Sequence, residues 1–186
     1  MKNLKVAFLV ANEGTERVEL TGPWEAVSDA GHQPVLFSPD GGDAELFDHL
    51  DRADSWPTVA LADAGTADDF AALVLPGGVA NADQLRTHDG AVAYAAAFLA
   101  SGKPVAAICH APWTLVEGDA VKGRLLTSWP SLQTDIRNAG AGWVDQRVVV
   151  DGNLITSRKP DDLPAFNAAL LEAINHGTTS AGTASR

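Results

Sequence analysis

The stretch PVAAICHAPW, residues 104–113, decides the fold and carries the only cysteine of the chain. Its nearly continuous apolar run ends at Cys109, a histidine follows at once, and Pro112 comes soon afterwards. Runs of this kind are typical of strands buried on both faces, as in a parallel sheet that is covered by helices. The stretch therefore predicts a strand that ends at Cys109, followed by a helix within Ala111–Glu117.

Similar patterns recur along the chain and alternate with helical ones. The other apolar, β-rich runs are Lys5–Ala11, Pro34–Pro39 and Ala71–Gly78. The helical stripes between them are Leu20, Trp24 and Val27, and then Val92, Ala96 and Leu99. Alternation of strand and helix is typical of α/β proteins with right-handed crossovers. We therefore predict a doubly wound, mostly parallel sheet with helices on both faces.

Two segments depart from this alternation. Gly41–Gly65 is acidic and irregular, and it predicts an excursion from the sheet such as a small hairpin. Trp143–Ser157 has two β-rich runs around Asp151-Gly152-Asn153, which predicts a β-hairpin near the C-terminus. A last helix should follow, with Leu163, Phe166, Leu170 and Ile174 as its buried stripe. We expect one domain over residues 1–176 and a disordered tail over residues 177–186.

The composition excludes several classes of function. A net charge of −11 opposes binding to nucleic acids and to anionic membranes. One cysteine cannot form an intrachain disulfide, no signal peptide is apparent, and no apolar stretch approaches the roughly 20 residues of a membrane span. The five histidines lack metal-ligand spacing, and no phosphate-binding glycine motif is present. We therefore expect a cytoplasmic protein without metal, cofactor, nucleic-acid or membrane partners.

Cys109 lies where an open α/β sheet binds its ligands, beyond the carboxyl end of a strand. A helix that begins just after it would favour the thiolate through the partial positive charge of its N-terminus. A buried, inert cysteine is the alternative, because a free cysteine packs like a small hydrophobic residue. Position alone leaves both interpretations open, and the neighbouring His110 favours the reactive one.

The segment AICHAP, residues 107–112, resembles the nucleophile elbow of the ThiJ/PfpI superfamily, in which a cysteine–histidine pair occupies this turn. Further segments resemble PfpI-type members in the same order along the chain. They are residues 11–25, 72–78, 102–112, 127–145 and 148–166. The resemblance implies a flavodoxin-like fold, which agrees with the pattern of strands and helices.

The resemblance also implies roles for individual residues. Glu16 matches the acid that approaches the cysteine, although the NEGTE loop before it is one residue longer than in compact members. The amides of Gly78 and His110 resemble an oxyanion hole, with Gly77 in the same turn. Asp83 is the acid closest to the carboxylate that, in PfpI-type proteins, a neighbouring subunit contributes to a cysteine–histidine–acid triad. A homodimer or hexamer is expected on the same ground.

Without the resemblance, Glu16 and Asp83 would be interpreted as caps of helices or turns. With it, we expect a stress-response enzyme with a cysteine nucleophile that acts on electrophilic carbonyls. Its reaction would be dicarbonyl detoxification or glycation repair on a small carbonyl substrate, as in a glyoxalase or deglycase, or hydrolysis of a peptide. The alternative is a non-catalytic redox sensor or chaperone-like stress protein that uses an oxidisable Cys109. Class I glutamine amidotransferases share the cysteine elbow, but they use a late histidine that lies two residues before a glutamate. The late histidine of this chain, His176, is followed by Gly-Thr, so we do not expect a glutaminase.

Overall fold

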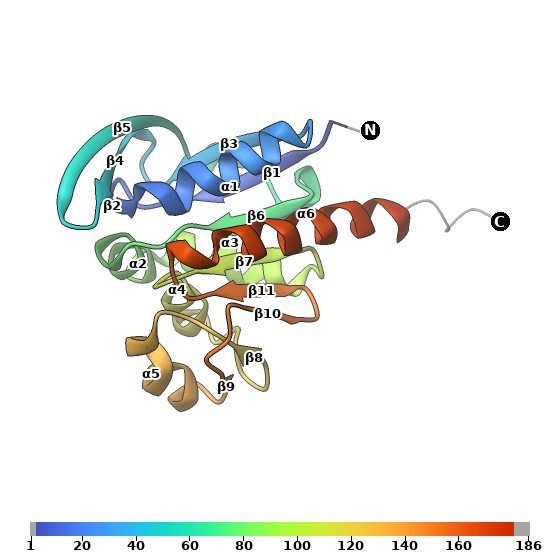
Figure 1. Ribbon diagram of the computed structural model, residues 1–186. Coiled ribbons are helices and arrows are strands. Elements are labelled where there is room, and N and C mark those ends of the chain that lie inside the picture. The colour runs from blue at the N-terminus through green and yellow to red at the C-terminus, as the bar shows by residue number, and fades with distance from the viewer. Residues whose placement is uncertain (1–2, 181–186) are drawn as a thin grey trace.

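The structure is a computed structural model that describes residues 3–180, with side chains described as far as His176. A nine-stranded sheet runs through the molecule in the order β10-β11-β7-β6-β1-β3-β5-β4-β2, and β8 and β9 form a separate two-stranded sheet (Figure 1). The strands are β1 (Lys5–Leu9), β2 (Glu13–Glu16), β3 (Gln33–Ser38), β4 (Gly42–Asp48), β5 (Asp51–Ala60), β6 (Ala72–Leu75), β7 (Val105–Ile108), β8 (Leu125–Leu126), β9 (Gly142–Trp143), β10 (Val148–Asp151) and β11 (Leu154–Ser157).

The centre of the large sheet is parallel, as the sequence predicts. Pairs β11–β7, β7–β6, β6–β1, β1–β3 and β3–β5 are all parallel. Every residue of β6, β7 and β11 is buried, because helices cover both faces and leave no side of these strands in water. The hairpin predicted near the C-terminus is confirmed, since β10 pairs antiparallel with β11 at one edge.

Helices form the two outer layers. They are α1 (Arg17–Asp29), α2 (Val79–Arg86), α3 (Asp89–Ala100), α4 (Pro112–Glu117), α5 (Gln133–Asn138) and α6 (Leu163–Ser180), with short 3₁₀ turns at Leu61–Asp63, Ala67–Asp69, Pro130–Leu132 and Pro160–Asp162. Figure 1 shows α1 and α6 in front of the sheet and α3 behind it. The buried side chains accordingly form two clusters, one beneath α1 and α6 and the other beneath α2, α3 and α4.

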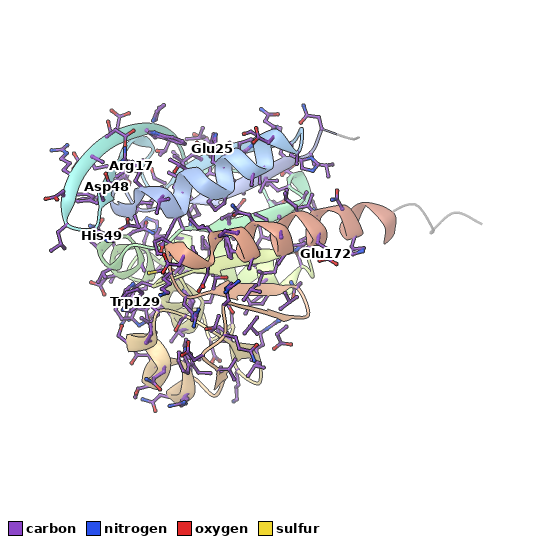
Figure 2. The ribbon with its side chains drawn as sticks, viewed as in Figure 1. Arg17, Glu25, Asp48, His49, Trp129 and Glu172 are labelled. Atoms are coloured by element: carbon purple, nitrogen blue, oxygen red, sulfur yellow. The ribbon has the colours of Figure 1, made fainter. Side chains whose placement is uncertain are left out.

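The acidic segment 41–65 is more regular than expected. Its strands β4 and β5 form a long antiparallel hairpin, and the hairpin joins the sheet because β5 pairs with β3 and β4 with β2. At its tip, Asp48 accepts a hydrogen bond of 2.9 Å from Nε of Arg17 at the start of α1. Figure 2 shows Arg17, Asp48 and His49 at one end of the molecule. The tip of the hairpin is therefore held beside the carboxyl ends of the central strands.

The predicted helices are present, with one shift in register. The stripe of α6 is confirmed, because Leu163, Phe166, Leu170 and Ile174 are all buried. In α3 the buried residues are Ala91, Ala95, Phe98 and Leu99, so Val92 and Ala96 lie one position off the buried face. Helix α6 continues to Ser180, past the expected start of the tail at residue 177, and residues 181–186 lie outside the described part of the chain.

Within residues 3–180, no helix is both long and apolar enough to cross a membrane.

Candidate active site

The cysteine lies at a sharp turn between β7 and α4. Cys109 follows the last residue of β7 and adopts a left-handed backbone conformation with φ of 63°. Two hydrogen bonds hold it there: its N–H donates to the Ser157 carbonyl (3.0 Å), and its own carbonyl accepts from the Trp129 N–H (2.9 Å). A non-glycine residue in this conformation costs free energy, and such residues are enriched at functional sites. The thiol is only 7% exposed and lines a cavity of about 600 Å³.

His110 contacts the thiol directly, although neighbouring side chains seldom face each other. Its Nδ1 lies 3.2 Å from Sγ of Cys109. The imidazole is packed between two indoles, with ring centroids 5.4 Å from Trp113 and 5.8 Å from Trp129. Burial lowers the pKa of His110 to about 4, so the ring is neutral at pH 7. A neutral imidazole at this distance is able to accept the thiol proton.

The carboxyl at the thiol is Glu19, which corrects the expectation for Glu16. Glu19 lies on the buried face of α1 with Leu20 and is fully inaccessible. Burial, and then the charge of Glu16, raise its pKa to about 8, against weaker opposing effects of the Cys109 thiol and the backbone of Gly77. At neutral pH Glu19 is therefore mostly protonated, and it is able to donate a hydrogen bond or a proton.

Glu16 lies one turn earlier, at the mouth of the cavity. Its Oε2 accepts a hydrogen bond of 3.1 Å from the backbone N–H of His49 at the hairpin tip, and His49 Nδ1 is 3.8 Å away. Glu16 is the last residue of β2 and the N-cap of α1, three residues before Glu19. The sequence contains a pattern that could have identified Glu19 as a buried acid. Glu19, Pro23 and Val27 follow one another at intervals of four residues, and all three are buried on the same face of α1.

The thiol itself is not activated in the way the sequence suggested. Burial, and then the charge of Glu19, raise the pKa of Cys109, whereas the backbone N–H groups of Gly78 and His110 lower it. Helix α4 has only six residues, and the net effect of the surroundings is to raise the pKa of the thiol and not to lower it. The charge of Glu19 disappears when that carboxyl is protonated. Cys109 and Glu19 therefore titrate as a coupled pair in which one proton can be exchanged.

Two glycines allow the backbone to approach the sulfur. A Cβ at Gly77 would overlap Glu19 Oε2 and lie 2.6 Å from the Cβ of Cys109. Gly78 has φ of 97°, and a Cβ there would collide with the carbonyl of Gly14. The backbone N–H groups of Gly78 and His110 both interact with the Cys109 thiol, and their role as an oxyanion hole stays a prediction.

Asn81 fixes this glycine turn, and sequence reasoning missed it. Its side-chain amide donates to the carbonyls of Pro76 (2.9 Å) and Gly77 (3.0 Å), and its Oδ1 accepts from the N–H of Ala11 (2.6 Å). The side chain is fully buried. Asparagine is common in turns and at helix caps, so an asparagine at this position does not by itself predict that the side chain fixes the glycine turn.

Asp83 lines the cavity from α2. Its Oδ1 is 3.9 Å from Nε of Arg86, and its side chain is 66% exposed. Within the described residues of one chain it makes no hydrogen bond or ion pair with His110. The structure therefore places Asp83 at the mouth of the cavity and does not join it to Cys109 and His110.

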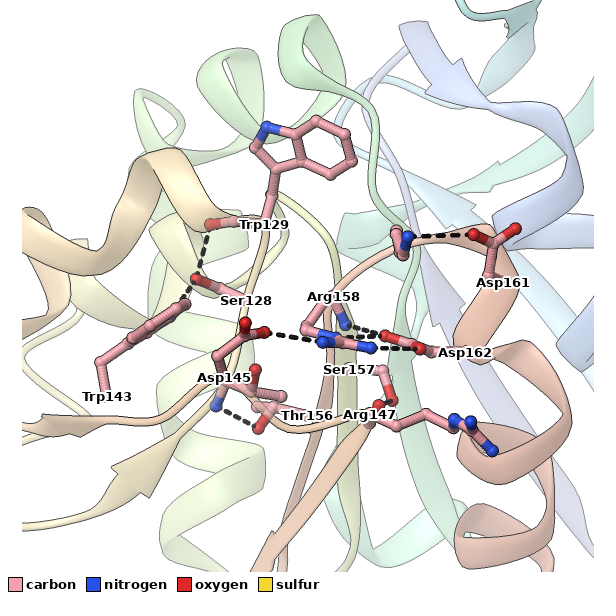
Figure 3. Close-up of polar contacts among 12 residues, drawn as sticks. Ser128, Trp129, Trp143, Asp145, Arg147, Thr156, Ser157, Arg158, Asp161 and Asp162 are labelled. Atoms are coloured by element: carbon pink, nitrogen blue, oxygen red, sulfur yellow. Dashed lines mark hydrogen bonds and ion pairs between the residues drawn. The ribbon is translucent and has the colours of Figure 1, made fainter.

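The remaining wall of the cavity is the loop after β8, which carries Trp129 (Figure 3). Ser128 Oγ donates to the Trp129 carbonyl and accepts from Trp143 Nε1, both at 2.9 Å. Beside it, Arg158 donates to Asp145 (2.7 Å) and to Asp162 (2.9 Å), which ties the end of β11 to the preceding loop. The Ser128 contacts fix the backbone of the loop that carries Trp129, whose indole stacks on His110.

Among residues 3–176, no group of three or more histidine, cysteine, aspartate or glutamate side chains is arranged to hold a metal ion.

A buried cysteine elbow with an adjoining protonated acid, on a parallel sheet of this order, defines a class of α/β proteins with a nucleophile elbow. The chain belongs to the DJ-1/PfpI family, whose model matches residues 4–173. It is 38% identical over 170 residues to the Bacillus subtilis protein named "Putative cysteine protease YraA", covering 91% of this chain and 98% of that one.

Two further comparisons agree with this membership. Over 172 residues the chain is 39% identical to the Escherichia coli protein named "Protein/nucleic acid deglycase 2", covering 91% of this chain and 97% of that one. The crystal structure of DJ-1beta from Drosophila melanogaster superposes with a TM-score of 0.81 at 26% identity, covering 99% of this chain and 100% of that one. Further relatives named as deglycases indicate enzymatic activity in the family, and the Bacillus subtilis relative is named only as a putative cysteine protease.

Proposed function

We propose that the chain is an enzyme with Cys109 as its nucleophile, and that it removes or repairs electrophilic carbonyl compounds. The observation that carries the proposal is the position of the thiol, 3.2 Å from a neutral His110 and beside a Glu19 whose pKa is raised to about 8. A nucleophile, a proton acceptor and a proton donor thus converge on one cavity. Relatives named as deglycases support the same reaction class.

With methylglyoxal as the substrate, the proposed reaction converts the dicarbonyl to lactate through a covalent intermediate on Cys109. The sulfur attacks the aldehyde carbon as its proton passes to His110, and the resulting oxyanion is held by the amides of Gly78 and His110. This gives a hemithioacetal. A proton then moves from the former aldehyde carbon to the neighbouring one, through Glu19 or His110, and leaves a lactoyl thioester. Water hydrolyses the thioester to lactate and frees the thiol, so that one methylglyoxal and one water give one lactate.

Peptide hydrolysis would use the same thiol and oxyanion hole through an acyl-enzyme. A buried carboxyl beside the thiol favours the carbonyl reaction, because moving a proton between adjacent carbons needs a group that takes the proton as a carboxylate and returns it as the acid, and a pKa of about 8 leaves a small ionised fraction of Glu19 at neutral pH for this step. A cysteine peptidase has no such step. The geometry therefore supports a small carbonyl substrate more strongly than a peptide.

The test is the Cys109→Ala variant, assayed for lactate formed from methylglyoxal. We expect turnover to fall to the background rate, because no other thiol exists in the chain. Circular dichroism and the thermal transition must match those of the parent, so that loss of activity is not loss of the fold. An unchanged rate would remove Cys109 from the mechanism.

A redox sensor is the second candidate, favoured by the same Cys109–Glu19 contact, because a protonated carboxyl can also stabilise a cysteine sulfinate by donating a hydrogen bond to it. Peroxide titration followed by intact-mass measurement separates the two functions. Oxidation of Cys109 at low peroxide, with no turnover of methylglyoxal or of peptides, would favour the sensor. Turnover that is abolished in step with oxidation would favour the enzyme.

A further inference from the structure

Two indoles contact the imidazole of His110. Its ring centroid is 5.4 Å from that of Trp113, with the planes tilted by 58°, and 5.8 Å from that of Trp129, with the planes at 25°. His110 is only 6% exposed, and its Nδ1 faces the Cys109 sulfur at 3.2 Å. The side chains of Trp113 and Trp129, which we call the indole pair, therefore take the place of water around a ring that can exchange a proton.

Trp113 is anchored by groups on two other helices. It lies three residues after His110, and its backbone N–H donates to the His110 carbonyl (3.0 Å), so a single turn of chain joins the two rings. Its Nε1 donates to Oδ2 of Asp135 on α5 (2.8 Å), and the guanidinium of Arg86 on α2 lies 5.2 Å from its ring centroid. The indole is thus held in place independently of the histidine that it contacts.

Trp129 reaches the same imidazole from the loop after β8 (Figure 3). Its backbone N–H donates to the Cys109 carbonyl (2.9 Å), and its own carbonyl accepts from Ser128 Oγ (2.9 Å). One residue therefore contacts the cysteine through its backbone and the histidine through its ring. The indole pair thus fixes His110 relative to the sulfur from two separate segments of the chain.

The charged groups around His110 do not explain why it is neutral. The acids on the surrounding elements are Glu13, Glu16, Glu19, Asp83, Glu117 and Asp135. The basic groups are His49, Arg17, which interacts with Glu16 and bonds Asp48, and Arg86, which lies 3.9 Å from Asp83 and 3.8 Å from Glu117. Carboxylates raise the pKa of an imidazole, whereas burial lowers the pKa of His110 to about 4. Exclusion of water therefore outweighs charge at this ring.

We propose that Trp113 is a positioning residue, which together with Trp129 keeps water away from His110, so that the imidazole stays uncharged with its Nδ1 at the sulfur even in mildly acidic solution. As a statement about turnover, this rests on the proposed function. An uncharged imidazole accepts the thiol proton at Nδ1 and returns it to the substrate oxyanion, so that no proton is gained or lost. A ring that already carries protons on both nitrogens cannot accept one.

The protonation of His110 is measured directly by NMR on protein labelled with ¹³C at the Cε1 atoms of histidine. His110→Gln identifies the signal among the five histidines by its disappearance. In the parent we expect no titration of His110 above about pH 5, because burial lowers its pKa to about 4. Trp113→Ala should admit water to the ring and raise the midpoint by at least about one pH unit towards the ordinary value of 6.5.

Further variants separate the role of the indoles from a general loss of packing. Trp113→Phe keeps an aromatic ring and should hold the midpoint within about half a pH unit of the parent. Trp129→Ala removes the other indole at a residue that is 39% exposed, which puts the fold at less risk, and should raise the midpoint as well. Trp56→Ala is the matched control, because Trp56 packs against Trp24 and is not one of the described residues that line the cavity.

Three results would overturn the proposal: a parent midpoint near 6.5, an unchanged midpoint in both Trp113→Ala and Trp129→Ala, or an equal rise in Trp56→Ala.

The pH dependence of turnover then connects the indole pair with catalysis. In Trp113→Ala, kcat for lactate formation should fall on the acid side at a higher pH than in the parent, by about the difference that NMR records for His110. A higher His110 midpoint with an unchanged kcat profile would overturn the positioning role. If the parent forms no lactate, only the proposed function fails, because the NMR titration still decides whether the indole pair keeps His110 uncharged.

Discussion

Glu19 shows how a single buried carboxyl couples stability to chemistry. It has no solvent exposure, and its two oxygens have no hydrogen-bond partner of good geometry within the described structure. Ionising such a group would leave a charge without water, so burial holds the proton on and raises the pKa to about 8. A carboxyl that keeps its proton at neutral pH is the acid that the proposed reaction requires.

This predicts how stability depends on pH. In the unfolded chain the pKa of Glu19 returns to about 4.5. Because the pKa is higher in the folded state, the folded protein binds the proton more tightly, and that contribution to stability is present below about pH 4.5 and is lost as the pH rises towards 8. Glu19→Gln cannot ionise, so we expect it to raise the free energy of unfolding at pH 8 by about 2–4 kcal/mol relative to its effect at pH 5.

Urea titrations of both proteins at the two pH values measure this difference. Glu25→Gln, an exposed change on the same helix, is the control and should show no such pH dependence. The same effect of Glu19→Gln at both pH values would mean that Glu19 is not held in its protonated form.

At the scale of elements, the site is made where the start of α2, the end of β6 and the strand β2 meet. The backbone N–H of Glu16 donates to the Gly77 carbonyl at 3.3 Å, and Asn81 bonds the same carbonyl from the other side. Glycine is required here because Gly78 has a positive φ and the neighbouring chain leaves no room for a Cβ. The position of the proposed oxyanion hole therefore depends on the packing of three elements.

Asn81→Ala should disturb this junction. It removes three buried hydrogen bonds and leaves the N–H of Ala11 and the carbonyl of Pro76 without that partner, so we expect a loss of about 2–4 kcal/mol in the free energy of unfolding. Turnover should fall as well, because the Gly78 amide would no longer be held at the sulfur.

Asn12→Ala is the matched control, since Asn12 also bonds backbone carbonyls but at the partly exposed hairpin, and it should cost about 1 kcal/mol or less. Thermal or urea unfolding and the lactate assay measure the two effects. Asn81→Ala with parental stability and turnover would contradict the role assigned to this side chain.

For the whole molecule, stability comes from two apolar layers on either side of one sheet. Helices α1 and α6 cover one face with Leu20, Val27, Phe166 and Leu170, all of which are fully buried. The reactive end lies at the carboxyl ends of the strands, whereas the start of β1 and the end of α6 lie at the opposite end (Figure 1). The apolar contacts of Phe166 and Leu170 therefore contribute to stability from outside the lining of the cavity.

Phe166→Ala should lower the stability of the fold without changing the reactivity of Cys109. The substitution leaves a cavity under α6, and we expect it to lower the free energy of unfolding by about 3–5 kcal/mol. Because Phe166 does not line the thiol cavity, iodoacetamide labelling of Cys109 below the unfolding transition should keep its parental rate. Val150→Ala, at a residue that is 58% exposed, is the control and should change stability by about 0.5 kcal/mol or less. A labelling rate that falls together with stability would show that the two parts are coupled.

Much of this architecture was predictable because it follows from local patterns. Continuous apolar runs predicted β1, β3, β6 and β7, and the Asp-Gly-Asn turn predicted the hairpin of β10 and β11. In α3 the prediction was one residue off, because a helix made mainly of alanine and other apolar residues has no distinct polar face to set its rotation. The β4–β5 hairpin was underestimated, since β5 is mostly exposed and its sequence, Asp51–Ala60, has no continuous apolar run.

The sequence by itself determined the alternation of strand and helix and the placement of Cys109 beyond the end of a strand, because hydrophobic period and turn chemistry act over a few residues. Only the tertiary structure decided that Glu19, one turn after Glu16, lies at the thiol, and that Glu13, Glu16 and Asp83 line the same cavity. These relations depend on how α1 is rotated against the Gly77–Gly78 turn. That rotation is set by contacts between segments about 60 residues apart, which no local pattern encodes.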